Sequence, residues 1–224
     1  TPQSRALAEK DWMESWKQHH PIIHVGKRLV IVPTWRQYQP QEHELPVALD
    51  PGLAFGTGLH PSTQLCLAAL ERHVRDGDEV LDVGTGTGIL SIAAAKLGAS
   101  RVLALDIDLA AVRAAQQNAL LNHVADQVQV RLGSVIPVRR TGEPDPPVIS
   151  DGQYHLVMAN IIAEVIAAMA PALHRVTRPE GIIITSGIIA ERESMVSEAF
   201  ASLAKLEQRT QDGDWLCLSF RPYA

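Results

Sequence analysis

The sequence has little of several features that would indicate a function directly. It contains two cysteines, Cys66 and Cys217, which lie far apart and without metal-ligand spacing, so a disulfide framework and a cysteine zinc site are excluded. No apolar run reaches membrane-spanning length, and no signal peptide is visible. The net charge of −5 at pH 7 gives no electrostatic support for nucleic-acid binding. We therefore expect a cytoplasmic protein with no metal site and with neither a membrane nor nucleic acid as its partner.

The remaining composition is that of a globular protein, 46% hydrophobic and 20% charged over 224 residues. This length allows one well-buried α/β domain with an appendage. The patterns predict a helix over residues 4–18, a hairpin from Ile22–Val25 and Leu29–Val32, and an irregular, proline-bearing connection over residues 33–50. Residues 1–50 are too few for a core of their own. We therefore expect them to form a linker helix and hairpin that pack on a domain of residues 51–224.

The stretch Val80–Leu90 has the pattern of a buried strand, a glycine turn and the start of a helix. Glycines let a backbone approach a ligand closely, and a helix N-terminus offers free N–H groups. Gly84, Gly86 and Gly88 give GxGxG, whereas the dinucleotide fingerprint needs its third glycine at position 89, which is Ile89. This spacing favours S-adenosylmethionine (SAM) over a nicotinamide dinucleotide as the cofactor. A glycine turn with a purely structural role is the alternative.

A second glycine-rich loop precedes this strand. Residues 50–63 carry three glycines and lead into a helix predicted from Ser62 to Val74, with Pro61 in its first turn. A loop of this kind can cover a bound ligand. The alternative is a long turn that only connects the hairpin to the helix.

Polar side chains follow or close three further predicted strands. Asp106 closes a strand about twenty residues after the glycine turn, where a carboxylate can accept both ribose hydroxyls of a nucleoside. The next strand leads to Ser134, where we expect a side chain in contact with adenine. Asn160 closes the strand after that, in the crevice where such sheets bind ligands. The alternative for Asn160 is that it caps the following helix, with Glu164 completing a capping box.

Strands and helices alternate along most of the chain, and an Asp212-Gly213 turn joins the last two strands as a hairpin. This order predicts an α/β, Rossmann-like sheet of seven mostly parallel strands with a C-terminal antiparallel hairpin. That is the fold of class I SAM-dependent methyltransferases.

Four segments together resemble the ribosomal protein L11 methyltransferases (PrmA): DPGLAFGTGLHPST at 50–63, VLDVGTGTGILSIAAAKLGA at 80–99, DID at 106–108 and ANII at 159–162. The resemblance covers essentially the whole chain. It implies a SAM-dependent enzyme that methylates lysine ε-amines and an N-terminal α-amine of a ribosomal protein. The cofactor contacts that it implies are made by Thr63, Gly84, Asp106 and Asn160, with Phe55, Gly56 and Thr57 in the loop near the methyl donor.

The chain departs from this family in one large respect. Members carry a small N-terminal recognition domain before the linker helix, and nothing here corresponds to it, so the resemblance implies the catalytic domain alone. No histidine or carboxylate is clearly placed as a general base at the end of the strand that Asn160 closes, and we hypothesise that the Asn160 side-chain oxygen and a nearby main-chain carbonyl hold the amine. The alternatives are a methyltransferase of a small amine or another protein, and a SAM-binding module without turnover. The sequence does not indicate an oligomeric state.

Overall fold

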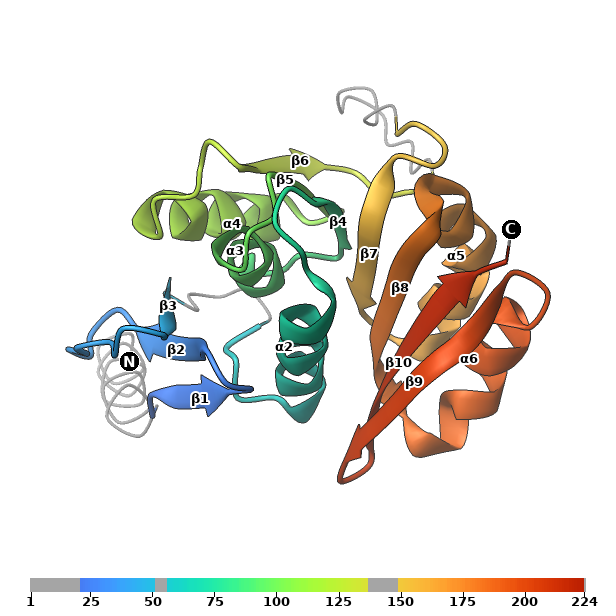
Figure 1. Ribbon diagram of the computed structural model, residues 1–224, viewed down its shortest axis with the longest axis horizontal. Helices are drawn as coiled ribbons and strands as arrows, with labels where there is room; N and C mark the ends of the chain where they lie inside the picture. Colours follow the sequence, from blue (N-terminus) through green and yellow to red (C-terminus); the bar gives the residue numbers. More distant parts are fainter. Residues whose placement is uncertain (1–20, 51–55, 137–148, 224) are drawn as a thin grey trace, which may run out of the picture.

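The computed structural model describes residues 21–50, 56–136 and 149–223 of the chain. The described strands form one three-stranded and one seven-stranded sheet (Figure 1). The helix expected over residues 4–18 and the loop residue Phe55 lie outside the described residues. Within the described ranges, none of the helices combines the length and the apolar composition that a bilayer-crossing helix needs.

The smaller sheet comes first in the chain. Strands β1 (Ile23–Val25) and β2 (Leu29–Pro33) form the predicted antiparallel hairpin. Strand β3 (Leu45–Leu49) lies on the other side of β2 and runs parallel to it. The prediction of an irregular connection over residues 33–50 is therefore wrong for the residues of β3.

Pro46 is compatible with strand β3 because of its position in the pairing of β3 with β2. The backbone N–H of Leu45 donates to Arg28, and the carbonyl of Leu49 accepts from Thr34, so β3 pairs through these residues on one side. Pro46 lies between them, on the edge that faces away from β2, where a missing N–H costs no ladder hydrogen bond.

The larger sheet has the strand order β6-β5-β4-β7-β8-β10-β9. Its strands are β4 (Glu79–Val83), β5 (Arg101–Asp106), β6 (Val128–Leu132), β7 (Tyr154–Asn160), β8 (Thr177–Ile189), β9 (Ala204–Asp212) and β10 (Trp215–Pro222). Strands β4, β5, β6, β7 and β8 all run parallel to one another. Strand β10 is antiparallel to both of its neighbours, β8 and β9. The predicted fold is thereby confirmed, including the C-terminal hairpin.

Helices cover both faces of this sheet (Figure 1). They are α2 (Pro61–His73), α3 (Ile89–Lys96), α4 (Leu109–Leu121), α5 (Ala163–Val176), the short 3₁₀ helix η1 (Ala190–Arg192) and α6 (Glu193–Phe200). The core on one face joins α2, α3 and α4 to the small sheet, with Ile31 and Val47 in the same buried cluster as Leu67 and Ile92. The core on the other face joins α5 and α6 to the sheet. The small sheet therefore shares a hydrophobic core with the helices that lead to the glycine turn.

The order of the strands determines where a ligand can bind. From β4 the chain moves outward to β5 and β6, and it then returns to β7 on the other side of β4. In such sheets ligands bind outside the carboxyl ends of the strands, at the point where the direction of winding reverses. Here that point lies between β4 and β7.

Candidate active site

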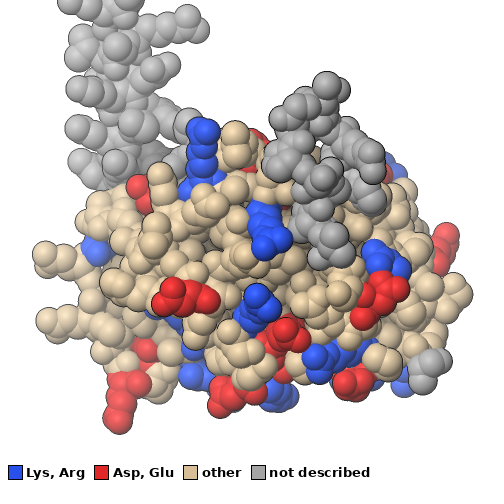
Figure 2. Space-filling view, turned by 90° about the horizontal axis from the view of Figure 1, so that it is seen from above, with Lys and Arg blue, Asp and Glu red and all other residues tan. Residues whose placement is uncertain are grey.

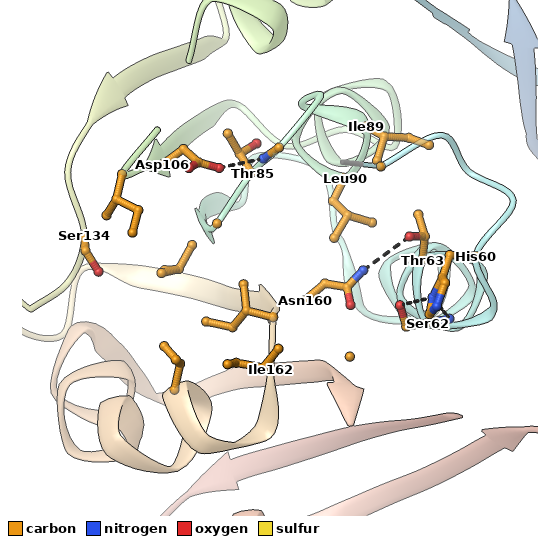
Figure 3. A pocket seen from close by; sticks show the side chains of 18 of the residues that line it. His60, Ser62, Thr63, Thr85, Ile89, Leu90, Asp106, Ser134, Asn160 and Ile162 are labelled. Atoms are coloured by element: carbon orange, nitrogen blue, oxygen red, sulfur yellow. Dashed lines mark hydrogen bonds between the residues drawn. The ribbon is translucent and has the colours of Figure 1, made fainter. Parts of the chain in front are cut away.

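A cavity of about 550 Å³ opens at the carboxyl ends of β4, β5 and β7 (Figure 3). Seven of the predicted site residues line it: Gly56, Thr63, Gly84, Gly86, Asp106, Ser134 and Asn160. Thr57 is described but does not line the cavity, and its hydroxyl accepts the N–H of Leu59. The residues come from segments that are more than a hundred positions apart along the chain, from Gly56 to Asn160, and the sheet topology brings them to one edge.

The glycine turn and Asp106 form one rigid unit. The backbone N–H of Gly86 donates to Asp106 Oδ2 over 2.9 Å, and the N–H of Asp108 donates to Oδ1 over 3.0 Å. Each carboxylate oxygen can accept more than one hydrogen bond, so both can still accept hydroxyl groups from a ligand. Asp108 itself caps α4 through the N–H of Ala110, as its position before the helix predicts.

The buried carboxyl of Asp82 stabilises the glycine turn. Asp82 on β4 is fully buried, and its Oδ2 accepts hydrogen bonds from the hydroxyls of Thr85 and Ser91 at 2.7 and 2.6 Å. Desolvation by burial is the largest influence on this group and raises the pKa of Asp82 to about 6. Asp82 holds the glycine turn in place without lining the cavity.

Asn160 does not cap the following helix. Its backbone still pairs with Ser186 as the last residue of β7, and α5 begins only after Ile162, which is the N-cap residue. Glu164 pairs with Arg192 and not with a helix cap. The capping alternative is therefore wrong.

The side chain of Asn160 points into the cavity toward α2 (Figure 3). Its Nδ2 donates to the hydroxyl of Thr63 over 3.3 Å. Its Oδ1 is buried and has no hydrogen-bond partner among the described residues. A buried oxygen without a partner is costly, and a ligand bound in the cavity would supply the missing donor.

The cavity also has apolar lining residues, among them Ile107, Val165 and Met169. Ser134 lines the cavity as well, and its buried hydroxyl likewise has no partner within the described part of the chain. Ser134 is predicted from the sequence as a cofactor contact, whereas the three apolar residues are not. Val165 and Met169 lie one helical turn apart on α5, a spacing that is equally typical of a core helix and carries no signal of its own.

His60 and Trp215 are two further cavity residues that the sequence analysis misses. Their rings meet edge to face with centroids 4.3 Å apart. His60 Nδ1 lies 3.2 Å from the backbone N of Ser62, whose N–H donates to it, and desolvation lowers the pKa of His60. Both the accepted N–H and the desolvation favour the neutral imidazole. His60 stands in a loop that the sequence singles out, whereas Trp215 reaches the site only because β10 folds back beside β8.

These groups fit SAM, a nucleoside joined to an amino acid. The Asp106 carboxylate suits ribose hydroxyls, the apolar lining side chains together with Ser134 suit a purine, and the N–H groups at the start of α3 suit a polar tail. Ser134 and Asn160 each carry a buried oxygen without a partner among the described residues, and both line the cavity, where a ligand would supply the missing hydrogen bonds. Among the described residues, no cluster of three or more histidine, cysteine or acidic side chains is arranged to hold a metal ion.

The charges on the surface do not indicate a polyanionic ligand. On the face shown in Figure 2, lysine and arginine side chains are interspersed with aspartate and glutamate, and neither sign dominates. The chain as a whole carries a net charge of −5.

Comparisons with known proteins identify the family of the chain. The family model of ribosomal protein L11 methyltransferase (PrmA) matches residues 2–222. A ribosomal protein L11 methyltransferase of Chloroflexus aurantiacus is 47% identical over 98% of this chain and 71% of its own length. One from an Exiguobacterium species is 44% identical over 95% of this chain and 65% of its own length. The chain thus spans about two thirds of the relatives that it matches.

Solved structures of similar proteins include one from the same family. A ribosomal protein L11 methylase from Lactobacillus delbrueckii subsp. bulgaricus superposes with a TM-score of 0.78 at 34% identity, covering 91% of this chain and 99% of that chain. A geranyl diphosphate methyltransferase bound to SAM shares the fold at 12% identity, with a TM-score of 0.56 over 70% of this chain and 84% of that chain. The chain belongs to the ribosomal protein L11 methyltransferase family and, with it, to the SAM-dependent methyltransferases.

Proposed function

We propose that this chain transfers the methyl group of SAM to amines of a ribosomal protein, with lysine ε-amines and an N-terminal α-amine as acceptors. The observation that carries this proposal is the buried Asn160 oxygen, which lies without a partner in the same cavity as the glycine turn and Asp106. We expect ribosomal protein L11 as the substrate because the relatives at 47% and 44% identity carry its name.

Several residues are proposed to hold the cofactor. Asp106 would accept the ribose hydroxyls, Ser134 would meet the adenine, and the backbone of Gly84 and Gly86 would pass close to the amino acid tail. Thr63 would meet the cofactor next to Asn160, because the two side chains are hydrogen-bonded to each other. SAM supplies an activated methyl group on a sulfonium, so the protein mainly has to align an amine with that group.

The acceptor amine has to reach the site without its proton. A lysine with a pKa near 10.4 costs roughly 4–5 kcal/mol to present in neutral form at pH 7. Burial and a nearby positive charge both lower an amine pKa. The Asn160 Oδ1 can then accept a hydrogen bond from the neutral amine and orient its lone pair.

The described cavity residues offer no strong base for this step. Their titratable side chains are His60 and Asp106. Asp106 already accepts two backbone N–H groups at the turn, and His60 Nδ1 faces Ser62. Deprotonation by a lowered amine pKa therefore agrees better with this cavity than deprotonation by a side chain.

Two further parts of the proposal concern the whole chain. We divide it into a linker helix and hairpin over residues 1–50 and a methyltransferase domain over residues 51–224. We also assign it to the cytoplasm, where ribosomal proteins are made, and both cysteines are buried free thiols, as a reducing compartment allows.

The decisive experiment is mass spectrometry of methyl transfer. Isolated ribosomal protein L11 is incubated with this chain and SAM, and peptide masses are searched for increments of one methyl group on lysine and on the N-terminus. The Asp106→Ala variant serves as the control that should lose cofactor binding. Addition of a recognition domain from a longer relative tests whether that domain is needed for the same substrate.

The alternatives give different results. Transfer to a small amine but not to the ribosomal protein would favour a different acceptor. SAM binding in calorimetry without transfer to any acceptor would favour a binding module. Binding of NAD in place of SAM would contradict the proposal altogether.

A further inference from the structure

Asn118 of α4 and Asn122, the C-cap residue of that helix, hydrogen-bond to strand β3 and to Asp50, the residue that follows it. Asn118 and Asn122 are four residues apart and are 2% and 5% exposed. Their side chains reach the edge of β3 that β2 leaves open. We refer to them as the asparagine pair.

Asn122 hydrogen-bonds to the open edge of β3 as a neighbouring strand would. Its Oδ1 accepts the N–H of Ala48 over 2.9 Å, and its Nδ2 donates to the carbonyl of the same residue over 2.6 Å. An amide side chain has the same donor and acceptor as a peptide group, so it can complete an edge in this way. Asn122 makes no contact with the glycine turn among its described hydrogen bonds.

Asn118 makes the same pair of bonds and one more. Its Oδ1 accepts the N–H of Asp50 over 3.1 Å, and its Nδ2 donates to the Asp50 carbonyl over 3.1 Å. The second proton of Nδ2 goes to the carbonyl of Thr87 over 2.9 Å. Thr87 lies between Gly86 and Gly88, so Asn118 joins the end of β3 directly to the glycine turn.

Thr87 is fully buried, and its side chain is hydrogen-bonded to a second segment, the one that contains Gly56. Its hydroxyl donates to the carbonyl of Gly56 over 2.7 Å. A Cβ at Gly56 would lie 2.7 Å from this hydroxyl, so the two backbones approach as closely as glycine allows. Gly56 lines the cavity, and so does Gly86, whose N–H is bonded to Asp106.

We infer that Asn118 is a positioning residue for cofactor binding: through Thr87 it sets the distance between the cavity wall at Gly56 and the wall at Gly86 and Asp106. Asn122, which has the same chemistry and nearly the same burial, only stabilises the fold. This inference rests on the proposed SAM-dependent function. It assigns a role in that function to a side chain that does not line the cavity.

The test compares Asn118→Ala with Asn122→Ala. Asn122→Ala removes hydrogen bonds to Ala48 of β3, Asn118→Ala removes those to Asp50 just after it, and both should lower the melting temperature. Only Asn118→Ala should weaken SAM binding, by about tenfold, because only it frees the Thr87 carbonyl. Asn122→Ala should change the dissociation constant by less than about twofold. The measurement is calorimetric titration of the full chain with SAM, at a temperature where both variants are folded.

Variants of Thr87 test the same inference without touching α4. Thr87→Ser keeps the hydroxyl and should bind SAM as the wild type does, whereas Thr87→Val keeps the shape, loses the bond to Gly56 and should bind about tenfold more weakly. These variants decide the matter should Asn118→Ala fail to fold. Equal loss of SAM affinity in Asn118→Ala and Asn122→Ala, or full affinity in Asn118→Ala or Thr87→Val, overturns the inference. Failure of the wild type to bind SAM would instead overturn the proposed function.

Discussion

Asn160 differs from the other polar residues of the cavity because one end of its amide is bonded and the other is not. We expect Asn160→Ala to lower kcat by about a hundredfold, since a misaligned amine loses most of the benefit of proximity. The dissociation constant of SAM should change by less than about fivefold, because Asp106 and the glycine turn stay in place. Steady-state methyl transfer and calorimetry measure the two effects.

Thr63→Ser is the control for this substitution. It keeps the hydroxyl to which Asn160 Nδ2 donates, so it should retain most of the turnover. Unchanged turnover in Asn160→Ala would remove Asn160 from the mechanism.

Asp82 gives a second prediction at the scale of single residues, one of pH dependence. Its pKa is about 6 in the folded protein, against 3.8 for an unperturbed aspartate. Between pH 3.8 and about 6 the folded protein therefore keeps a proton on Asp82 that the unfolded chain has lost. The stability that protonation adds is present below about pH 4 and is lost as the pH rises through about 6. Asp82→Asn cannot ionise, so the free energy of unfolding of the wild type relative to this variant should fall by about 2–3 kcal/mol from pH 4 to pH 7.

Urea unfolding at several pH values measures this difference. Asp126→Asn, which removes one charge from an exposed position, is the matched control. A constant difference between the wild type and Asp82→Asn over this pH range would contradict the prediction.

How much of the site could be predicted depends on how local its signals are. Asp106 and Asn160 are predictable because each polar residue ends an apolar strand, and the fold then places strand ends together. Trp215 is not, because it begins a strand like any other apolar residue. Its place in the site depends on the antiparallel return of β10 beside β8, which brings Trp215 opposite Ile189.

At the scale of elements, the glycine turn is constrained by its neighbours as well as by its own backbone. Gly84 has φ +79°, and a Cβ there would lie 2.5 Å from Ile161 Cγ2. Gly77 has φ +89°, but nothing lies within 4 Å of the Cβ position. We expect Gly77→Ala to cost about 1–2 kcal/mol of stability from backbone strain alone.

Gly84→Ala should cost more and should also weaken SAM binding, because Ile161 follows Asn160 and both line the cavity. Chemical unfolding and SAM titration of the two variants give this comparison. Equal stabilities with unchanged SAM affinity would show that the close approach of Ile161 has no role.

An element can be predicted from the sequence when the pattern that determines it is local. The strand, turn and helix of residues 79–96 carry their pattern within one short stretch, and their prediction is confirmed. Strand β3 is missed because its stability comes from elsewhere. One of its edges is paired with β2 and the other is bonded to Asn118 and Asn122, which lie about seventy residues later in the chain. No local pattern records such partners.

At the scale of the whole molecule, the small sheet and the large one should unfold together. Val47 of β3 and Val80 of β4 are both fully buried and belong to the same hydrophobic cluster. Val47→Ala and Val80→Ala should therefore each lower the free energy of unfolding by about 2 kcal/mol and shift a single transition. Far-ultraviolet circular dichroism and tryptophan fluorescence should give coincident curves for both variants. If residues 21–50 were an independent unit, Val47→Ala would instead split off an early transition, while Val80→Ala would leave that transition in place.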